Sequence, residues 1–506
     1  MKAIHYAIFL LHLCAPLFAQ NDCAPGMFYD HIGQNNDFTA IASLNNGDYL
    51  VGGNTFASGV TPLQQKMYFA RVDACGQSIW TAVYGQTNEA FTVADIHHPS
   101  GTDYFVAAVQ YRHYNSDLYY FGLVKLNLLG DTLWMRKYMA GSNQAMPNSV
   151  IQTTDGGFAL AGYTKNTVGN NNNIWFIKTD SQGNIQWDKN YNTNNSIETA
   201  KQVIQLPDEG YLLMGTRFSG VATNILLLRT NAQGLPIWAH TYGNNFITEG
   251  NHIIPTTYGY LIAGKQYDEE LGLASYGPYL LKVDTLGNML WESSYPKSQF
   301  YPHSIERVMQ LPNDVVMCLA NVYPSEGPAN GCLIKVDNQG NMTWGMYYQN
   351  AATSLMGNDC FFDFQPAPNG GYMICGFSFT GTPLHIYDAW IVRTDSLGNA
   401  CPPYNGCWVV GVQDNSPPLD GSGGGGMVVY PNPATNTLLI NATHLTAAHV
   451  LTISLYTPQG QLATRHTAPG GATIQLHTHT LPLGIYYCHI QVNGQTPQTQ
   501  KLVIIR

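Results

Sequence analysis

The stretch IKTDSQGNIQW at residues 177–187 has close copies along the chain, among them ARVDACGQSIW at 70–80, LKVDTLGNMLW at 281–291 and IKVDNQGNMTW at 334–344. The glycine of each copy marks a repeat, and these glycines are Gly76, Gly130, Gly183, Gly234, Gly287, Gly340 and Gly398. They are separated by 54, 53, 51, 53, 53 and 58 residues. A period this regular indicates an array of similar structural units.

The first six units each contain four short runs rich in Val, Ile, Tyr and Phe, which is the composition of β-strands. In the first unit these runs are 38–44, 48–54, 67–72 and 78–84. The tip between the last two predicts a tight hairpin loop, in which Asp or Asn caps main-chain N–H groups and glycine takes a positive φ. A second turn signature recurs earlier in the units, as in DGGFALAG at 155–162.

A tryptophan opens the fourth predicted strand of six units, namely Trp80, Trp134, Trp187, Trp238, Trp291 and Trp344. Burial of such a ring against a neighbouring sheet stabilises by roughly 2–3 kcal/mol, so we interpret these residues as docking residues. The seventh unit has Pro402 at this position. Since proline cannot continue a strand ladder, the seventh unit is expected to lack its own fourth strand.

The N-terminal segment FYDHIG at 28–33 is expected to supply that strand, because it aligns with WTAVYG at 80–85 and places Phe28 at the tryptophan position. Residues 28–32 would then pair with DAWIVRT at 388–394 and close a ring. The predicted fold is all-β, with a seven-bladed β-propeller of four-stranded blades over residues 21–408. The unit resembles the tryptophan-docked propeller repeats of many bacterial exported proteins.

A Gly/Pro/Ser-rich linker at 409–426 separates the repeats from a second β-rich unit at 427–506, whose short strands predict a small Ig-like β-sandwich. Four of its segments together resemble the type A C-terminal sorting domain of the type IX secretion system. They are YPNP (Tyr430, Pro431, Asn432 and Pro433), ISLYTPQG with Gly460, LPLGIYY with Gly484, and KLVIIR with Lys501. The hairpin has Thr457 where the family has aspartate.

The resemblance implies recognition by the type IX secretion machinery at the outer membrane, with the domain commonly removed as cargo is released or anchored to the cell surface. A plain carbohydrate-binding sandwich is the alternative.

Residues 1–20 have one lysine, an apolar core and a small residue, Ala19, which is the layout of a secretory signal peptide. No later stretch approaches the roughly 20 apolar residues of a transmembrane segment. We therefore expect a secreted or surface-attached protein.

Charge and cysteine content narrow the partners further. The net charge is -10 and no cluster of lysine and arginine is present, which argues against nucleic acid. Without Cys14 of the signal peptide, nine cysteines remain in an oxidising compartment. The predicted bridges are Cys318 with Cys332 and Cys360 with Cys375, across hairpins, and Cys23 with Cys401 or Cys407, which would lock the ring.

Five acids stand just ahead of the innermost predicted strands: Asp37, Glu89, Glu198, Glu249 and Asp359. Repeat symmetry would place them around one mouth of the central channel, where converging carboxylates attract a cation such as calcium or a cationic ligand. Alternatively, each acid accepts hydrogen bonds from its own loop. The sequence identifies no other cofactor, and His477 and His479 are too few to form a metal site.

Three classes of function fit these observations. The first is a binding or adhesion module that presents a glycan or protein ligand site on one propeller face. The second is a polysaccharide lyase or glycosidase with carboxylates at the channel mouth. The third is a structural component of the cell surface. Binding is favoured, because the sequence has no G-x-S-x-G elbow, H-E-x-x-H helix, P-loop or C-x-x-C pair and assigns no catalytic residue.

Overall fold

The computed structural model describes residues 26–29, 34–400 and 428–504. Within these ranges the gaps are 57–64, 87, 114–117, 140–143, 166–171, 193–195, 244–245, 269–274, 296–302, 323–328, 349–357, 369, 380–386, 397, 399, 431–436, 443–444, 447, 458–460, 483 and 494–497. The regular structure of the described residues is β-strand, apart from one 3₁₀ turn, η1 (Pro312–Asp314). No helix in this part of the chain has the length and hydropathy needed to cross a membrane.

Seven four-stranded antiparallel sheets are present in the described residues before position 400. Sheet 1 contains β2 (Asn35–Ser43), β3 (Tyr49–Phe56), β4 (Lys66–Val72) and β5 (Ser78–Tyr84). Sheet 2 contains β6 (Glu89–His97), β7 (Tyr104–His113), β8 (Tyr119–Asn127) and β9 (Thr132–Tyr138). Sheet 3 contains β10 (Gln144–Gln152), β11 (Phe158–Lys165), β12 (Asn172–Thr179) and β13 (Ile185–Tyr191). In each sheet the strands pair in chain order.

Sheets 4 to 6 repeat this order, and sheet 4 contains β14 (Ile197–Gln205), β15 (Tyr211–Phe218), β16 (Thr223–Thr230) and β17 (Pro236–Tyr242). Sheet 5 contains β18 (Thr248–Thr256), β19 (Gly259–Asp268), β20 (Ser275–Val283) and β21 (Met289–Ser294). Sheet 6 contains β22 (Ser304–Gln310), β23 (Val316–Val322), β24 (Asn330–Val336) and β25 (Met342–Tyr348). Sheet 7 combines β26 (Asp359–Pro366), β27 (Tyr372–Phe379) and β28 (Tyr387–Arg393) with the N-terminal β1 (Gly26–Tyr29).

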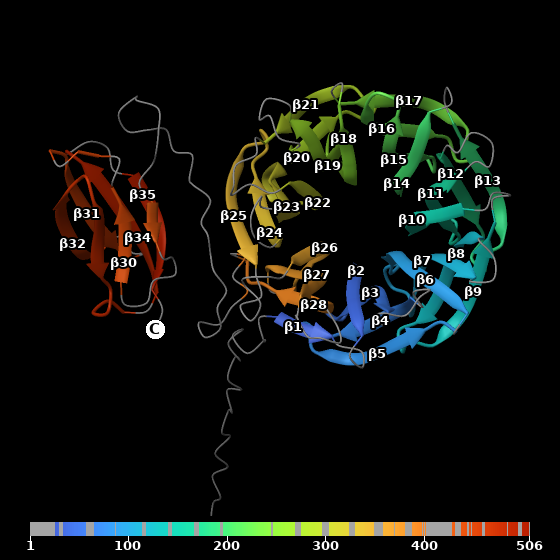
Figure 1. Cartoon of the computed structure of the whole chain (residues 1–506), viewed down its shortest axis with the longest axis horizontal. Helices are drawn as coiled ribbons and strands as arrows, with labels where there is room; N and C mark the ends of the chain where they lie inside the picture. Colours follow the sequence, from blue (N-terminus) through green and yellow to red (C-terminus); the bar gives the residue numbers. More distant parts are fainter. Residues whose placement is uncertain are drawn as a thin grey trace, which may run out of the picture.

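The sheets surround a common centre in a propeller-like ring, and the innermost strands are β2, β6, β10, β14, β18, β22 and β26 (Figure 1). Each inner strand contacts the inner strand of the next sheet, and β26 of sheet 7 contacts β2 of sheet 1. The apolar core is divided among the sheet junctions. One cluster, for example, joins Val106 and Phe121 of sheet 2 to Phe158 and Leu160 of sheet 3. Side-chain burial between adjacent sheets therefore holds the ring together.

Sheet 7 is completed by the two ends of the repeat region. Strand β1 pairs with β28, as expected, but it spans 26–29 instead of the predicted 28–32, and Tyr29 lies opposite Ala389. In sheet 1 the equivalent pair is Tyr84 with Met67, while Trp80 lies four residues earlier opposite Arg71. Tyr29 therefore takes the position of Tyr84. The prediction that Phe28 occupies the tryptophan position is wrong, because the strand register places it next to this tyrosine.

The tips of the outer hairpins have the predicted chemistry. In sheet 3, Oδ1 of Asp180 accepts hydrogen bonds from the N–H groups of Gln182 and Asn184 at 2.9 and 2.8 Å, and Gly183 has a φ of 78°. The same cap is made by Asp73, Asn127, Asn231, Asp284 and Asp337. An added Cβ at Gly183 would lie 3.0 Å from the ring of Trp134. The glycine thus allows the turn and also makes room for a tryptophan of the preceding sheet.

A tyrosine that the sequence prediction overlooked links every pair of adjacent sheets. The hydroxyl of Tyr138, at the end of the outer strand of sheet 2, donates a hydrogen bond of 2.7 Å to the carbonyl of Gly183 in the tip of sheet 3. The seven pairs are Tyr29 with Gly76, Tyr84 with Gly130, Tyr138 with Gly183, Tyr191 with Gly234, Tyr242 with Gly287, Tyr295 with Gly340 and Tyr348 with Gly398.

The predicted disulfides within sheets 6 and 7 do not form. Cys318, Cys332 and Cys375 are buried free thiols. The register explains this result, since Cys318 lies opposite Ile334 and Cys332 opposite Ala320, two positions away, while Cys360 lies opposite Phe377. Cys75 in the tip of sheet 1 is disulfide-bonded. The expected partners Cys23, Cys401 and Cys407 are outside the described residues.

Two further sheets form a separate β-unit from residue 428 onward. Their strands are β29 (Val428–Tyr430), β30 (Thr437–Asn441) and β33 (Thr473–His477) in one sheet, and β32 (Leu462–Pro469), β31 (Val450–Tyr456), β34 (Gly484–Val492) and β35 (Gln498–Ile504) in the other. Buried residues from both sheets, such as Ile440, Ile453 and Ile490, share one core.

The expected sorting residues fall at several places in this β-unit. Tyr430 ends β29 opposite Leu439, Gly484 begins β34 opposite Ile504, and Lys501 lies opposite Tyr487. Pro431, Asn432, Pro433 and Gly460 lie outside the described residues.

Candidate functional site

The five acids predicted to ring the channel mouth are held within their own sheets. Glu198 pairs with Arg217 at 2.7 Å and Glu249 with Lys265 at 3.3 Å, and in both cases the partner is the residue directly opposite on the second strand. The carboxylate charges are therefore balanced by cross-strand partners.

The other three acids also contact partners within their own sheets. Asp37 accepts hydrogen bonds from the main-chain and side-chain nitrogens of Asn54 at 3.0 and 2.9 Å, and burial raises its pKa to about 6. Asp359 accepts a bond of 2.6 Å from Ser378. Glu89 accepts one from Tyr111 at 3.0 Å and pairs with Lys137 at 3.3 Å. The structure does not bring the five carboxylates together, and the described residues contain no group of three or more His, Cys, Asp or Glu placed to bind a metal.

A β-bulge interrupts the inner strand of every sheet at the same point. In sheet 2, for example, the register with the second strand shifts between Val93 and Asp95. The residues that follow the seven bulges, here called the post-bulge residues, are Ala40, Asp95, Ser149, Gln202, His252, Arg307 and Asp363. Bulges redirect side chains, and here they turn a polar residue of most sheets toward the ring centre.

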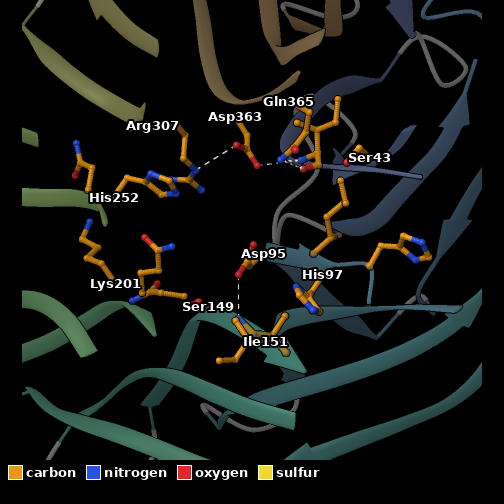
Figure 2. Close-up of a pocket in the computed structure, with 18 residues that line it drawn as sticks. Ser43, Asp95, His97, Ser149, Ile151, Lys201, His252, Arg307, Asp363 and Gln365 are labelled. Carbon is orange, nitrogen blue, oxygen red and sulfur yellow. Dashed lines mark hydrogen bonds and ion pairs between the residues drawn. The ribbon is translucent and has the colours of Figure 1, made fainter. Parts of the chain in front are cut away.

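Six of the seven post-bulge residues, all except Ala40, line a pocket of ≈ 310 Å³ on the axis of the ring. All seven inner strands line it, together with His98, which follows β6. The lining residues are Ile41, Ala42 and Ser43; Asp95, Ile96, His97 and His98; Asn148, Ser149, Val150 and Ile151; Lys201 and Gln202; Asn251 and His252; Arg307; Asp363 and Gln365. Figure 2 shows Asp95, His252, Arg307 and Asp363 directed into this space. None of the five predicted acids lines it, because they precede these residues on the same strands.

Most post-bulge side chains accept a hydrogen bond from the main chain of the next sheet. Asp95 accepts from the N–H of Val150 at 2.9 Å, and Gln202 from that of Ile253 at 2.8 Å. Ser149, His252 and Asp363 accept in the same way from Val203, Val308 and Ile41. These bonds satisfy N–H groups on the unpaired edges of the inner strands and fix the orientation of the pocket side chains.

Two post-bulge residues depart from this pattern. Ala40 has no side-chain acceptor, and Arg307 has only donors. Arg307 pairs instead with Asp363, with 3.3 Å between Nε and Oδ1. The other carboxylate oxygen of Asp363 accepts from Ile41. Asp363 thus joins sheet 6 to sheet 1 across the pocket rim.

Burial controls the charges in the pocket. It raises the pKa of Asp95 to about 7, although the Val150 N–H and the charge of Arg307 act in the opposite direction. Burial also raises the pKa of Asp363, against the effect of Arg307. Asp363 and Asp95 raise the pKa of Arg307 despite its desolvation. Arg307 is therefore a permanent cation between two carboxyl groups.

Two histidines that line the pocket, His252 and His97, are neutral at physiological pH. Burial, reinforced by Arg307, holds the pKa of His252 well below its usual value. Burial and the neighbouring His98 lower the pKa of His97 to about 4. With carboxylates, amides and neutral imidazoles on its walls, the pocket is suited to a polar ligand that forms several hydrogen bonds.

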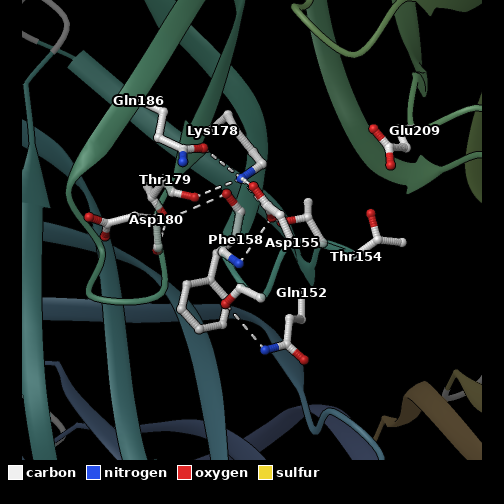
Figure 3. A network of polar contacts seen from close by, with 12 residues as sticks. Gln152, Thr154, Asp155, Phe158, Lys178, Thr179, Asp180, Gln186 and Glu209 are labelled. Carbon is white, nitrogen blue, oxygen red and sulfur yellow. Dashed lines mark hydrogen bonds and ion pairs between the residues drawn. The ribbon is translucent and has the colours of Figure 1, made fainter.

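A second polar cluster, in sheet 3, is structural. Nζ of the buried Lys178 donates to Asp155, to the carbonyl of Thr179 and to Gln186 at 2.7–2.8 Å (Figure 3). Asp155 belongs to the second turn signature of the repeat. Equivalent pairs join Arg71 to Asp48 and Arg229 to Asp208, so the signature serves to tie the inner hairpin to the third strand.

Comparison with known proteins identifies the C-terminal unit. Residues 428–505 match the family model of the secretion system C-terminal sorting domain. The chain is therefore cargo of the type IX secretion system and is exported to the cell surface or the extracellular space. No curated protein matches the chain.

Solved structures with some likeness to the chain include Sqt1 from Chaetomium thermophilum, at 12% identity and a TM-score of 0.41, with 76% of this chain and 87% of that chain covered. A protein of unknown function from Dyadobacter fermentans has 11% identity and a TM-score of 0.35, over 73% and 98%. A GH43 β-1,3-galactosidase has 12% identity and a TM-score of 0.33, over 74% and 94%. Similarity this weak carries no functional inference.

Proposed function

We propose that the mature protein is a surface-exposed or secreted binding module, with a seven-bladed β-propeller over residues 21–408 that holds a saccharide ligand in its axial pocket. The linker 409–426 would join it to an Ig-like sorting sandwich at 427–506, in which Tyr430, Gly484 and Lys501 belong to the segments that the secretion machinery recognises. The proposal rests chiefly on the convergence of polar side chains from all seven inner strands on one pocket.

The pocket is organised before any ligand arrives. Five of its side chains are fixed by main-chain N–H groups of the neighbouring blade, as described for Asp95 and Gln202. Fixed side chains lose little conformational entropy on binding, which favours affinity. Saccharides suit such a site because their hydroxyl groups both donate and accept hydrogen bonds.

A pair of matched variants tests the location of binding. Ile151 lines the pocket, whereas Ile185 is 48% exposed on an outer strand. We expect the wild-type protein to bind members of a glycan array, Ile151→Trp to lose that binding because the indole fills the pocket, and Ile185→Trp to retain it. Binding that survives in a folded Ile151→Trp protein would place the ligand elsewhere, and absence of any glycan binding would favour a structural surface component.

A glycosidase or lyase is the second candidate, because two carboxyl groups share the pocket and the pKa of Asp95 is raised to about 7, within the range of a general acid. Both carboxyl groups, however, already accept main-chain hydrogen bonds that join the blades. This structural role accounts for their position, so binding is preferred. Release of new reducing ends or unsaturated sugars from polysaccharides by the wild-type protein, abolished in Asp95→Asn, would establish the enzyme instead.

A further inference from the structure

The hydrogen-bonding capacity of the pocket is unevenly distributed. Figure 2 shows Lys201, His252 and Arg307 on one side and Asp95 and His97 on the other. Lys201 and Gln202, His252 and Arg307 come from three consecutive inner strands, β14, β18 and β22. We call these four residues the donor side, because their side chains supply N–H donors.

Two residues of the donor side, Gln202 and His252, have a side-chain acceptor, and both direct it to a main-chain N–H group. Oε1 of Gln202 accepts from Ile253, so the amide NH₂ group is the part that can serve a ligand. Nδ1 of His252 accepts from Val308 at 3.2 Å, so the neutral ring carries its proton on Nε2. The wall facing the pocket is thereby supplied with N–H donors.

Arg307 and Lys201 add positive charge to this wall. Arg307 uses Nε for Asp363 and Nη1 for the carbonyl of Glu306, and Nη2 remains for other partners within the described residues. Lys201 is the extra residue of its bulge and is solvent-exposed at the pocket rim. Convergent donors with two cations match the two acceptor oxygens of a carboxylate.

The neighbouring asparagines provide for the rest of a saccharide. Asn148 and Asn251 donate their amide groups to the carbonyls of Ala200 and Ile305 at 2.6 and 3.1 Å, which turns both NH₂ groups toward the next sheet. Their side-chain oxygens can then accept from ligand hydroxyl groups. The arrangement thus suits a sugar that carries one carboxylate and several hydroxyl groups.

We propose that the donor side, formed by Lys201, Gln202, His252 and Arg307, binds the carboxylate of an acidic saccharide, so that uronate-containing glycans are the ligand class. This inference rests on the proposed saccharide-binding function and specifies it. Binding should strengthen as the pH falls through the pKa of Asp95, because a protonated Asp95 no longer repels the ligand carboxylate across the pocket.

The sharpest test changes one donor without changing shape. In Gln202→Glu, one carboxylate oxygen can still accept the Ile253 N–H, while the donor NH₂ group becomes a second, negatively charged oxygen. Gln182→Glu introduces the same change in an exposed tip outside the pocket. Calorimetric titration would use oligogalacturonates and alginate oligosaccharides as acidic probes and neutral galacto-oligosaccharides as the comparison.

We expect the wild type and Gln182→Glu to bind an acidic probe at least tenfold more tightly than the neutral one, and Gln202→Glu to lose at least tenfold in that affinity with its melting temperature retained. Acidic binding by the wild type should weaken from pH 6 to pH 8. Tighter binding of neutral sugars, or unchanged acidic binding in folded Gln202→Glu, would overturn the carboxylate site and leave saccharide binding intact. Failure to bind either probe class would count against the proposed function itself.

Discussion

The hydroxyl group of Tyr29 donates a hydrogen bond to the main-chain carbonyl of Gly76, and this bond joins the first strand of the chain, in sheet 7, to the tip of sheet 1. It is one of seven equivalent tyrosine–glycine contacts around the ring. The N-terminal strand thus contributes a junction contact of the same kind as the six other outer strands.

Removal of this hydroxyl should weaken ring closure. We expect Tyr29→Phe to lower the unfolding free energy by about 1–2 kcal/mol, because a buried carbonyl loses its donor. Tyr138→Phe removes the equivalent bond between sheets 2 and 3 and provides the matched control. Chemical denaturation of both variants is the measurement. A loss in Tyr138→Phe with no loss in Tyr29→Phe would show that β1 does not hold the ring in solution.

The charge of Asp95 should make stability depend on pH. Its pKa rises from 3.8 to about 7 on folding, so the folded state binds the proton more tightly, and the stability contributed by the protonated form is lost as pH rises from about 4 to about 7. Asp95→Asn keeps an oxygen for the Val150 N–H and removes the titration. The melting temperature of Asp95→Asn relative to the wild type should therefore increase between pH 5 and pH 8.

The comparison of Asp95→Asn with the wild type also controls for the titration of His97. His97, whose pKa is lowered, acts with the opposite sign between about pH 4 and 6.5, but it does so in both proteins and largely cancels in the difference. A constant difference across the pH range would mean that Asp95 is ionised throughout.

The buried thiols offer a direct check on the cysteine assignment. Cys318, Cys332 and Cys375 are free and buried, and burial raises the pKa of each thiol. We expect all three to resist iodoacetamide in the native protein and to react fully in guanidinium chloride without reductant, as measured by peptide mass spectrometry. A mass two hydrogens lower for a linked pair would instead reveal a disulfide.

Sorting and folding information should be separable. The core of the C-terminal unit contains residues from 438 onward, whereas the propeller junctions have their own apolar clusters. Deletion of 427–506 should therefore leave the propeller folded, with an unchanged circular dichroism melting curve, but retained in the periplasm. Cell fractionation provides the measurement. Normal surface delivery of the truncated protein would contradict the sorting role of residues 428–505.

The repeat could be predicted from sequence because its signatures answer fixed demands of the backbone. Gly183 must adopt a positive φ and leave space for Trp134, and Asp180 must cap two N–H groups. These demands recur in each tip, so the residues recur with them. The tyrosines that donate to the tip glycines were equally regular, four residues after each tryptophan, and their role went unrecognised because it requires knowledge of the next sheet.

The pocket could not be predicted in this way. Most post-bulge residues need only an acceptor directed at a main-chain N–H, and Asp95, Ser149, Gln202 and His252 all meet that need with different side chains. No common residue marks the position. The acids ahead of the strands were more visible, but their partners, such as Arg217 for Glu198, become evident only from the strand register.

The bonds between post-bulge side chains and the next sheet have a consequence for how such a ring can evolve. Their donors are main-chain N–H groups, which any residue except proline offers. A blade could therefore be duplicated, lost or exchanged without redesign of its neighbours at these contacts. The ion pair of Arg307 with Asp363 is different, since it needs a particular residue on each side. The other post-bulge contacts described above use main-chain donors, so this side-chain pair distinguishes the junction of sheets 6 and 7. Because both side chains are needed, we expect sheets 6 and 7 to be inherited as a unit.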